Sequence, residues 1–302
     1  MSATGLRVHA TGAQCLVEDL GRRGLTSIGV GRSGAADRGS LRRANRALAN
    51  EEGDAALEVT FGGLVVEPVG GPVWLCVTGA PCPVTVDGRD VGADTVFSAP
   101  AGAVVRLGTP ERGLRSYLAV RGGVAVEPVL GSRSRDVMAA LGPDQVAEGD
   151  LLPVGRPGGS QPTVDSVLPL ALPARDEPLV LRAVRGPRDG WLAEADGLVS
   201  TSWVASERSN RVGMRLEASP AEAGGGEAPV LRHADDAPSL PSEGAWRGAV
   251  QVPPDGEPVL FLADHPVTGG YPVVAVVVDT DVDLAAQARP GQPVRFRWTS
   301  PR

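Results

Sequence analysis

Short apolar segments separated by Gly, Pro and Asp recur along the chain. In the first half they are rich in Val or aromatic residues and have the length of β-strands. They cover residues 64–66, 73–77, 84–86, 95–97, 104–107 and 116–120. The Asp87-Gly88 dipeptide between two such segments is typical of a tight hairpin turn. This spacing predicts an antiparallel barrel or sandwich.

The same pattern returns after a stretch rich in Gly and Pro at residues 155–175, which indicates a linker or long surface loop. The later strands are expected at residues 179–184, 201–204, 213–216, 250–252, 259–262, 273–278 and 294–298. A Gly- and Ala-rich segment at 219–228 predicts a mobile loop. We therefore expect two β-rich lobes: an N-terminal lobe with the linker at 1–175, and a C-terminal lobe at 176–302.

One helix is expected in the first half, over ten residues beginning at Ser40. Leu41, Ala44 and Leu48 fall on one face of it, with arginines elsewhere. Asp37 or Ser40 is placed to cap its start.

Composition supports many short elements, because Gly (40) and Pro (27) are abundant and aromatics make up 4%. A net charge of −7 argues against nucleic acid as the main partner. No apolar run is long enough to span a membrane, and the first residues do not resemble a signal peptide. Three cysteines and three scattered histidines give no metal-binding spacing. We expect reduced cysteines, a cytoplasmic protein and no bound metal.

All 29 basic residues are arginines, since the sequence contains no lysine. Schiff-base chemistry, a phosphate-loop lysine and a biotin-accepting lysine are therefore impossible on this chain. Any biotin must be carried by another chain, and phosphate must be held in another way.

A glycine motif, GVGRSG at 29–34, matches the G-x-G-x-x-G pattern of dinucleotide-binding folds. The segment before it is short and half polar, and the segments after it look like hairpins. We therefore do not expect a dinucleotide-binding fold.

Further sequence blocks carry the strongest functional signal. In chain order they are GAQCLVEDLGRRG (12–24), GVGRSGAADR (29–38), ALEVTFGG (56–63), YLAVRGG (117–123), VLGSRS (129–134), SNRVGMRL (209–216), PSEG (241–244), GAVQVPPDG (248–256) and LADHPVTGGYP (262–272).

These blocks resemble, in the same order, the signatures of the carboxyltransferase-like family that includes the C subunit of 5-oxoprolinase, allophanate hydrolase subunit 2 and KipA-like regulators. The resemblance extends from about Gly5 to Phe296. It implies a mainly β fold of two cyclophilin-like β-barrel lobes with a few short helices.

The resemblance leaves three functions open. The first is a subunit, inactive alone, of an ATP-dependent 5-oxoprolinase, working with a subunit 1-like protein (the B component) and a further hydrolase chain (the A component). ATP is then expected on a partner or at a shared interface, because no nucleotide-binding loop is recognisable here. The second is a carboxyltransferase acting on urea or a related amide, with biotin on another chain. The third is a regulator that binds a subunit 1-like partner.

The segment from Asp264 to Tyr271 is the expected catalytic site. Asp264 is expected to orient or deprotonate an amide N–H, Tyr271 to donate to a carbonyl, and His265 to act as an acid or base. The structural alternative is a tight hairpin, with Asp264 capping backbone groups and His265 shaping a turn.

Substrate-binding groups are expected beside these residues. Thr268, Gly269 and Gly270 can present backbone N–H groups to a developing charge. Gln251 offers both a donor and an acceptor.

Asn210 and the arginines around it form a second candidate binding group. Arg211 and Arg215 can bind a carboxylate or phosphate, and regular alternation places them on one strand face. The alternative is that one of the nearby arginines, including Arg208, pairs with a glutamate while the others are solvated.

In the first block, Asp19, Arg22, Ser33 and Asp37 are candidates to line a cleft. Asp37 capping the helix and Asp19 pairing with Arg22 are the structural alternatives. Glu58 is either buried beside an arginine or an ordinary surface residue.

The chain departs from the family pattern at Glu18, at Asn210, at residues 265–267 and at Val273. Several of these positions belong to the expected site, so they leave the amide substrate open.

Overall fold

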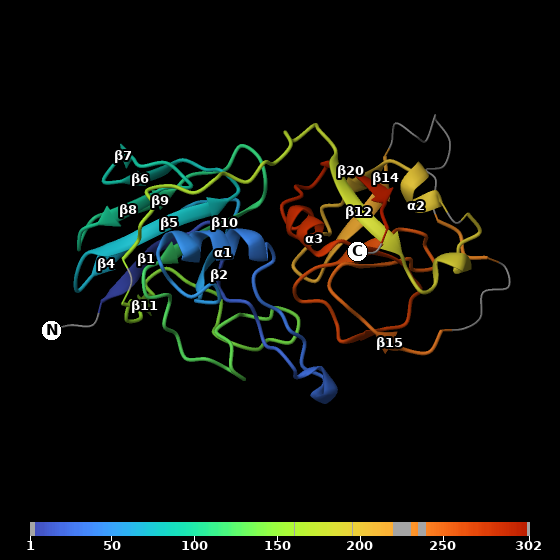
Figure 1. Ribbon diagram of the computed structural model, residues 1–302, viewed down its shortest axis with the longest axis horizontal. Coiled ribbons are helices and arrows are strands. Elements are labelled where there is room, and N and C mark those ends of the chain that lie inside the picture. The colour runs from blue at the N-terminus through green and yellow to red at the C-terminus, as the bar shows by residue number, and fades with distance from the viewer. Residues whose placement is uncertain (1–3, 160, 195, 220–230, 235–239, 301–302) are drawn as a thin grey trace. The chain divides into compact units, whose positions relative to one another are not determined.

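The computed structural model describes residues 4–159, 161–194, 196–219, 231–234 and 240–300 (Figure 1). Its contacts divide the chain into two compact units. Unit 1 comprises residues 1–23, 33–136 and 140–172, and unit 2 comprises 24–32, 137–139 and 173–302, as far as they are described. The lobe boundary at residue 175 stays a prediction, and segments 24–32 and 137–139 group with the later part of the chain.

The described residues of unit 1 form two antiparallel sheets and one helix (Figure 1). The six-stranded sheet has the order β11-β1-β4-β9-β6-β7, and the five-stranded sheet has the order β2-β3-β10-β5-β8. The elements are β1 (Gly5–Thr11), β2 (Gln14–Glu18), α1 (Arg38–Ala47), β3 (Ala56–Thr60), β4 (Leu64–Val69), β5 (Val73–Gly79), β6 (Val84–Val86), β7 (Arg89–Asp90), β8 (Val96–Ala99), β9 (Val105–Leu107), β10 (Arg115–Val120) and β11 (Leu151–Pro153).

Alternation along β10 explains how these layers pack. Leu118 and Val120 point into the core that both sheets share, whereas Tyr117 and Ala119 point to the opposite face. Helix α1 covers that second face and contacts β5 and β10. Every residue of β10 is buried, because both faces of this strand are covered.

The local signals for the helix and the hairpin are confirmed. Asp37 is the N-cap of α1 and accepts a hydrogen bond from the Ser40 backbone N–H at 2.8 Å. In the hairpin, β6 pairs with β7, and Asp87 and Gly88 have φ angles of 49° and 78°. Two consecutive positive φ values are characteristic of the expected tight turn.

Unit 2 is built around a closed barrel of seven strands in the order β12-β19-β16-β17-β14-β13-β20 (Figure 1). Strand β12 runs parallel to β20, and the other neighbours are antiparallel. The elements are η1 (Thr26–Ile28), β12 (Leu179–Arg185), η2 (Asp189–Trp191), α2 (Gly197–Ser200), β13 (Trp203–Ala205), β14 (Gly213–Ala218), β15 (Glu243–Gly244), β16 (Ala249–Gln251), β17 (Val259–Phe261), β18 (Thr268–Gly269), β19 (Val273–Val277), α3 (Asp279–Ala285) and β20 (Pro293–Trp298).

The barrel interior is filled by alternate residues of these strands, including Met214, Val250 and Leu260. Their neighbours Val259 and Phe261 belong to a separate apolar cluster. This second cluster lies on the outer side of β17, where the candidate site is found.

The expectation of a mainly β chain with a few short helices is confirmed, and each strand predicted above overlaps an observed strand. Helix α3 was not predicted, because its seven residues contain three aspartates and form a short, weakly periodic segment. The GVGRSG motif follows the 3-10 turn η1 rather than a strand. Most of the predicted mobile loop at 219–228 lies outside the described residues. Within the described part, no helix is long and apolar enough to cross a membrane.

Candidate functional site

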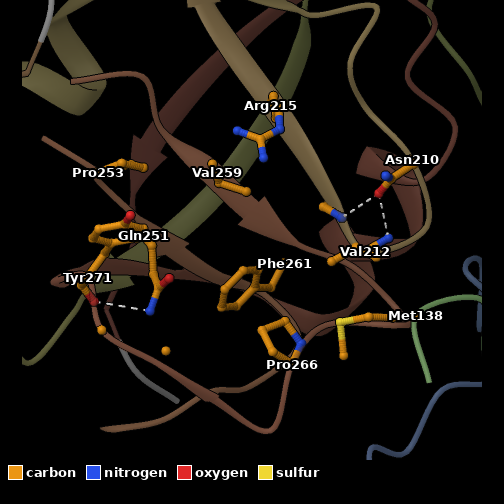
Figure 2. A pocket seen from close by; sticks show the side chains of 13 residues that line it. Met138, Asn210, Val212, Arg215, Gln251, Pro253, Val259, Phe261, Pro266 and Tyr271 are labelled. Carbon is orange, nitrogen blue, oxygen red and sulfur yellow. Dashed lines mark hydrogen bonds between the residues drawn. The ribbon is translucent and has the colours of Figure 1, made fainter. Parts of the chain in front are cut away.

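A pocket of about 360 Å³ lies on the outer side of the unit 2 barrel, over β14, β16 and β17 (Figure 2). Thirteen residues line it: Met138, Asn210, Val212, Gly213, Arg215, Gln251, Pro253, Val259, Phe261, Pro266, Gly269, Gly270 and Tyr271. Its volume is at the small end of the range for small-molecule sites.

Strand register places two polar residues of the pocket, Arg215 and Gln251, in one row on either side of Val259. Arg215 of β14 is the cross-strand partner of Val259 of β17, and Val259 is the partner of Gln251 of β16. Cross-strand partners share a sheet face, so all three side chains point to the outer side. Since neighbouring strands lie about 4.8 Å apart, the Arg215 and Gln251 Cα atoms are separated by roughly 10 Å.

Much of the pocket lining is apolar. Phe261 stands at the centre of the close-up view, with Val259 on the same strand and Pro266 beside it (Figure 2). Met138 closes another side (Figure 2). Apolar walls with few fixed polar groups are typical of sites for small organic molecules.

The Gln251 side chain is buried and fixed in orientation. Its Nε2 donates to the Tyr271 backbone carbonyl at 3.0 Å, as the dashed line in Figure 2 shows. Its Oε1 atom has no hydrogen-bond partner among the described residues. Gln251 therefore offers an acceptor to a bound amide N–H.

Asn210 offers a hydrogen-bond donor that complements the Gln251 acceptor. Its Oδ1 accepts from the backbone N–H groups of Val212 at 2.8 Å and Gly213 at 3.3 Å (Figure 2). With the oxygen used in this way, the Nδ2 group remains to donate to a ligand oxygen.

Of the thirteen residues that line the pocket, Arg215 carries the charged side chain. It is exposed, and its guanidinium makes no ion pair with any residue in the described ranges. Its backbone is held by Ser209, whose Oγ accepts from the Arg215 N–H at 3.1 Å. The neighbouring Arg208 differs, because it pairs with Glu217 at 3.1 Å and Glu257 at 2.6 Å.

A small ribbon, β15 paired with β18, contributes Gly269 of β18 to the pocket lining. Glu243 of β15 forms an ion pair with Arg188, and the Arg188 guanidinium stacks on Trp191 at 5.1 Å. A Cβ atom added at Gly269 of β18 would lie 2.6 Å from Gln251 Nε2, whereas one at Gly270 would meet open space. Glycine at 269 therefore permits close approach of the ribbon to Gln251.

Asp264 is buried away from the pocket lining. It forms an ion pair with Arg211 at 2.9 Å and accepts from the Val137 backbone N–H at 3.1 Å. Strand β14 begins only at Gly213, so Arg211 precedes it, and the expectation that Arg211 and Arg215 share a strand face is wrong. The Arg211 side chain is buried against Asp264 and is not among the residues that line the pocket.

The remaining residues of the expected catalytic segment have separate positions. The His265 ring stacks on Phe261, with centroids 5.8 Å apart, and its Nδ1 lies 2.8 Å from the Pro266 carbonyl oxygen. Thr268 is exposed in β18 and is not a lining residue. Tyr271 lines the pocket with its side chain 46% exposed, so it is accessible to a ligand or a partner.

The candidates of the first block are buried within unit 1. Asp19 accepts from Ser132 Oγ at 2.7 Å, from Ser134 Oγ at 2.6 Å and from the Arg133 backbone N–H at 2.7 Å. Arg22 donates instead to the backbone carbonyls of residues 129 and 134. The structural alternative of an Asp19–Arg22 pair is therefore wrong, because each side chain binds the loop at residues 129–134 separately.

Ser33 and Gly34 complete this packed region. Ser33 is fully buried with a φ of 54°, and its Oγ lies 3.4 Å from the Arg135 carbonyl oxygen. Gly34 has a φ of 93°, and an added Cβ would lie 2.8 Å from the Gly21 backbone nitrogen. The positive φ and this close backbone contact require glycine at position 34, so a bound ligand is not needed to explain it.

Glu58 is buried beside an arginine, as one of the two sequence alternatives proposed. It accepts from the Tyr117 hydroxyl at 2.7 Å and from the Ala36 N–H at 2.9 Å, with Arg115 Nε at 3.4 Å. Burial, together with the Glu58 and Asp37 charges, raises the pKa of Tyr117 well above its usual value. The Tyr117 hydroxyl also accepts from the Asp37 N–H, so this network fixes the start of α1.

Sequence reasoning missed much of the apolar lining. Val259 and Phe261 had a usable signal, because they alternate with the core residue Leu260 in a short strand. Met138 had none, since only tertiary packing groups residues 137–139 with unit 2.

Comparison with known proteins places these features in a family. The family described as Carboxyltransferase domain, subdomain A and B, matches residues 28–298. The C subunit of 5-oxoprolinase from Escherichia coli strain K12 is 34% identical over 297 residues, covering 96% of this chain and 90% of the relative.

Two solved structures are similar over nearly the whole chain. TTHA0988 has a TM-score of 0.84 at 32% identity and covers 98% of this chain. The K. lactis urea amidolyase has a TM-score of 0.86 at 26% identity and covers 99%. The chain spans only 56% of the first and 19% of the second structure. From the family match and the identity to the Escherichia coli protein, this chain belongs to the carboxyltransferase domain family, subdomain A and B.

Proposed function

We propose that this chain is the C subunit of an ATP-dependent 5-oxoprolinase, which opens 5-oxoproline to glutamate. The observation that carries the proposal is the 34% identity to the C subunit of a bacterial 5-oxoprolinase over 96% of this chain and 90% of that relative.

The chemistry of the pocket is compatible with a lactam. In the overall reaction, water adds to the ring carbonyl carbon, the C–N bond breaks, and the nitrogen leaves as an amine after taking a proton. Gln251 Oε1 can accept the ring N–H, and Asn210 Nδ2 can donate to the ring carbonyl oxygen, where negative charge develops. Neither group titrates, so we assign them binding and orientation rather than proton transfer.

The partners and the energy source belong to the same proposal. Working partners are a subunit 1-like protein (the B component) and a hydrolase chain (the A component). ATP binds on a partner or at an interface shared with one. Without lysine, this chain can supply only arginine side chains as permanent cations to a phosphate.

The test is ADP release by reconstituted mixtures. The three proteins together are expected to release ADP in proportion to added 5-oxoproline and to form glutamate. This chain alone, and the two partners without it, are expected to give only background. If adding this chain to its partners changes neither product, the proposal is wrong.

A urea-type carboxyltransferase is the second candidate, supported by the TM-score of 0.86 to a urea amidolyase. In that reaction a carboxyl group leaves the ring nitrogen of carboxybiotin and bonds to a urea nitrogen, whose proton passes to biotin. Biotin would arrive on another chain, since this one lacks lysine. Transfer of labelled bicarbonate to urea, in a mixture with a carboxylated biotin carrier, distinguishes this candidate from lactam hydrolysis.

A further inference from the structure

We propose that Arg215 is the specificity residue of the pocket and selects small cyclic amides that carry a carboxylate over neutral amides. The choice of a cyclic amide rests on the proposed function. The requirement for a carboxylate comes from the pocket itself.

The first observation is charge. Among the thirteen lining residues, Arg215 carries the charged side chain, and no carboxylate is among them. Its guanidinium has no ion-pair partner within the described ranges, whereas Arg208 and Arg211 are both paired. A guanidinium presents its N–H groups in a planar fork that fits a carboxylate with two parallel hydrogen bonds.

The second observation is register. Arg215 and Gln251 flank Val259 in one row across three strands, so a cation and an amide acceptor face the same pocket about 10 Å apart at their Cα atoms. Both side chains extend into that space. A compact ring lying over Val259 would have its N–H within reach of Gln251 and a carboxylate on the adjacent ring carbon within reach of the long Arg215 side chain.

The third observation is the environment of Arg215. Apolar side chains of Val212, Val259 and Phe261 line the same pocket, whereas the Arg215 residue itself is exposed. A ring bound against these side chains would cover part of the guanidinium, so its charge pair with a carboxylate would be screened less than one on an open surface. Neutral amides such as urea would leave the arginine without a partner and gain nothing from it.

The experiment measures binding by calorimetry to this chain, alone and with its partner proteins. The probes are 5-oxoproline, 2-pyrrolidinone, which has the same lactam ring without the carboxylate, and urea. Wild type is expected to bind 5-oxoproline at least tenfold more tightly than 2-pyrrolidinone. Arg215→Gln is expected to remove that preference while leaving the affinity for 2-pyrrolidinone unchanged, and Arg215→Lys to keep part of it.

Arg208→Gln is the matched control, because Arg208 is also exposed but is paired with glutamates and is not a lining residue. It is expected to keep the wild-type preference. An undiminished preference in Arg215→Gln, or no preference in the wild type in either preparation, would overturn the inference. Thermal melts of both variants check that the exposed substitutions leave the fold intact.

These outcomes separate this inference from the proposed function. Carboxylate selectivity that depends on Arg215, without 5-oxoproline-dependent ADP release, supports the site and rejects the 5-oxoprolinase. ADP release that survives in Arg215→Gln with unchanged affinity supports the enzyme and rejects the role of Arg215.

Discussion

Arg211 and Asp264 form a buried two-point ion pair, with Nε to Oδ2 at 2.9 Å and Nη2 to Oδ1 at 3.2 Å. The same carboxylate accepts from the Val137 backbone N–H, one residue before Met138 of the pocket wall. The aspartate that the sequence suggested as a catalytic group thus lies in a position to hold the polypeptide that shapes the pocket.

Asp264→Asn is expected to lower the free energy of unfolding by about 3–5 kcal/mol, because it removes the negative charge from a buried two-point ion pair with Arg211. Urea titration measures the effect. Glu257→Gln, which breaks an exposed pair with Arg208, is the control and should leave stability nearly unchanged. Full stability of Asp264→Asn combined with lost activity would instead support a catalytic role.

Gly269→Ala is expected to weaken ligand binding several-fold, because the new Cβ would lie 2.6 Å from Gln251 Nε2 and displace that amide. The lost hydrogen bond to the Tyr271 carbonyl corresponds to about 1 kcal/mol. Gly270→Ala is a neighbouring control whose Cβ would meet open space. Calorimetry with 5-oxoproline compares the two variants, and equal affinities would contradict the prediction.

Tyr117→Phe is expected to destabilise the protein by about 1–3 kcal/mol, because the buried Glu58 carboxylate loses a donor and the Asp37 N–H loses an acceptor. The second tyrosine supplies the control: Tyr271 is an exposed residue, so removing its hydroxyl in Tyr271→Phe should have little effect on stability. Denaturant midpoints of the two variants give the comparison. Similar midpoints would show that the Glu58–Tyr117 network contributes no net stability.

The three thiols are expected to be unreactive in the folded protein. Cys15, Cys76 and Cys82 are free and buried, and burial raises the pKa of each. At pH 8, a thiol reagent should modify them slowly in the native protein and all three rapidly in denaturant. A thiol that reacts rapidly without denaturant would reveal local opening of unit 1.

Stability is expected to fall in alkaline solution. Burial raises the pKa of Cys76 from 9.0 to about 12. The unfolded chain therefore loses this proton first, so the stabilisation is fully present below about pH 9 and is lost as pH rises toward 12. Urea titrations from pH 8 to 11 under reducing conditions measure the decline. Cys76→Ser should make the fall of stability with pH less steep, by up to about 1.4 kcal/mol per pH unit. An unchanged slope would contradict the raised pKa of Cys76.

Local features of this protein could be predicted from the sequence because they depend on neighbouring residues. Asp37 caps α1, Asp87-Gly88 turns the β6–β7 hairpin, and the short strands follow alternation and turn residues. The ordered motifs also identified the family. Lack of lysine is likewise a property of composition alone.

Tertiary structure decided which of these residues meet. Arg211 and Arg215 look equivalent in sequence, yet the first is buried against Asp264 and the second lines the pocket. Their difference depends on where β14 begins and on its register with β17 and β16, which are set by non-local hydrogen bonds. Met138 joins the pocket for the same physical reason: contacts far apart in sequence, rather than local propensity, place its segment there.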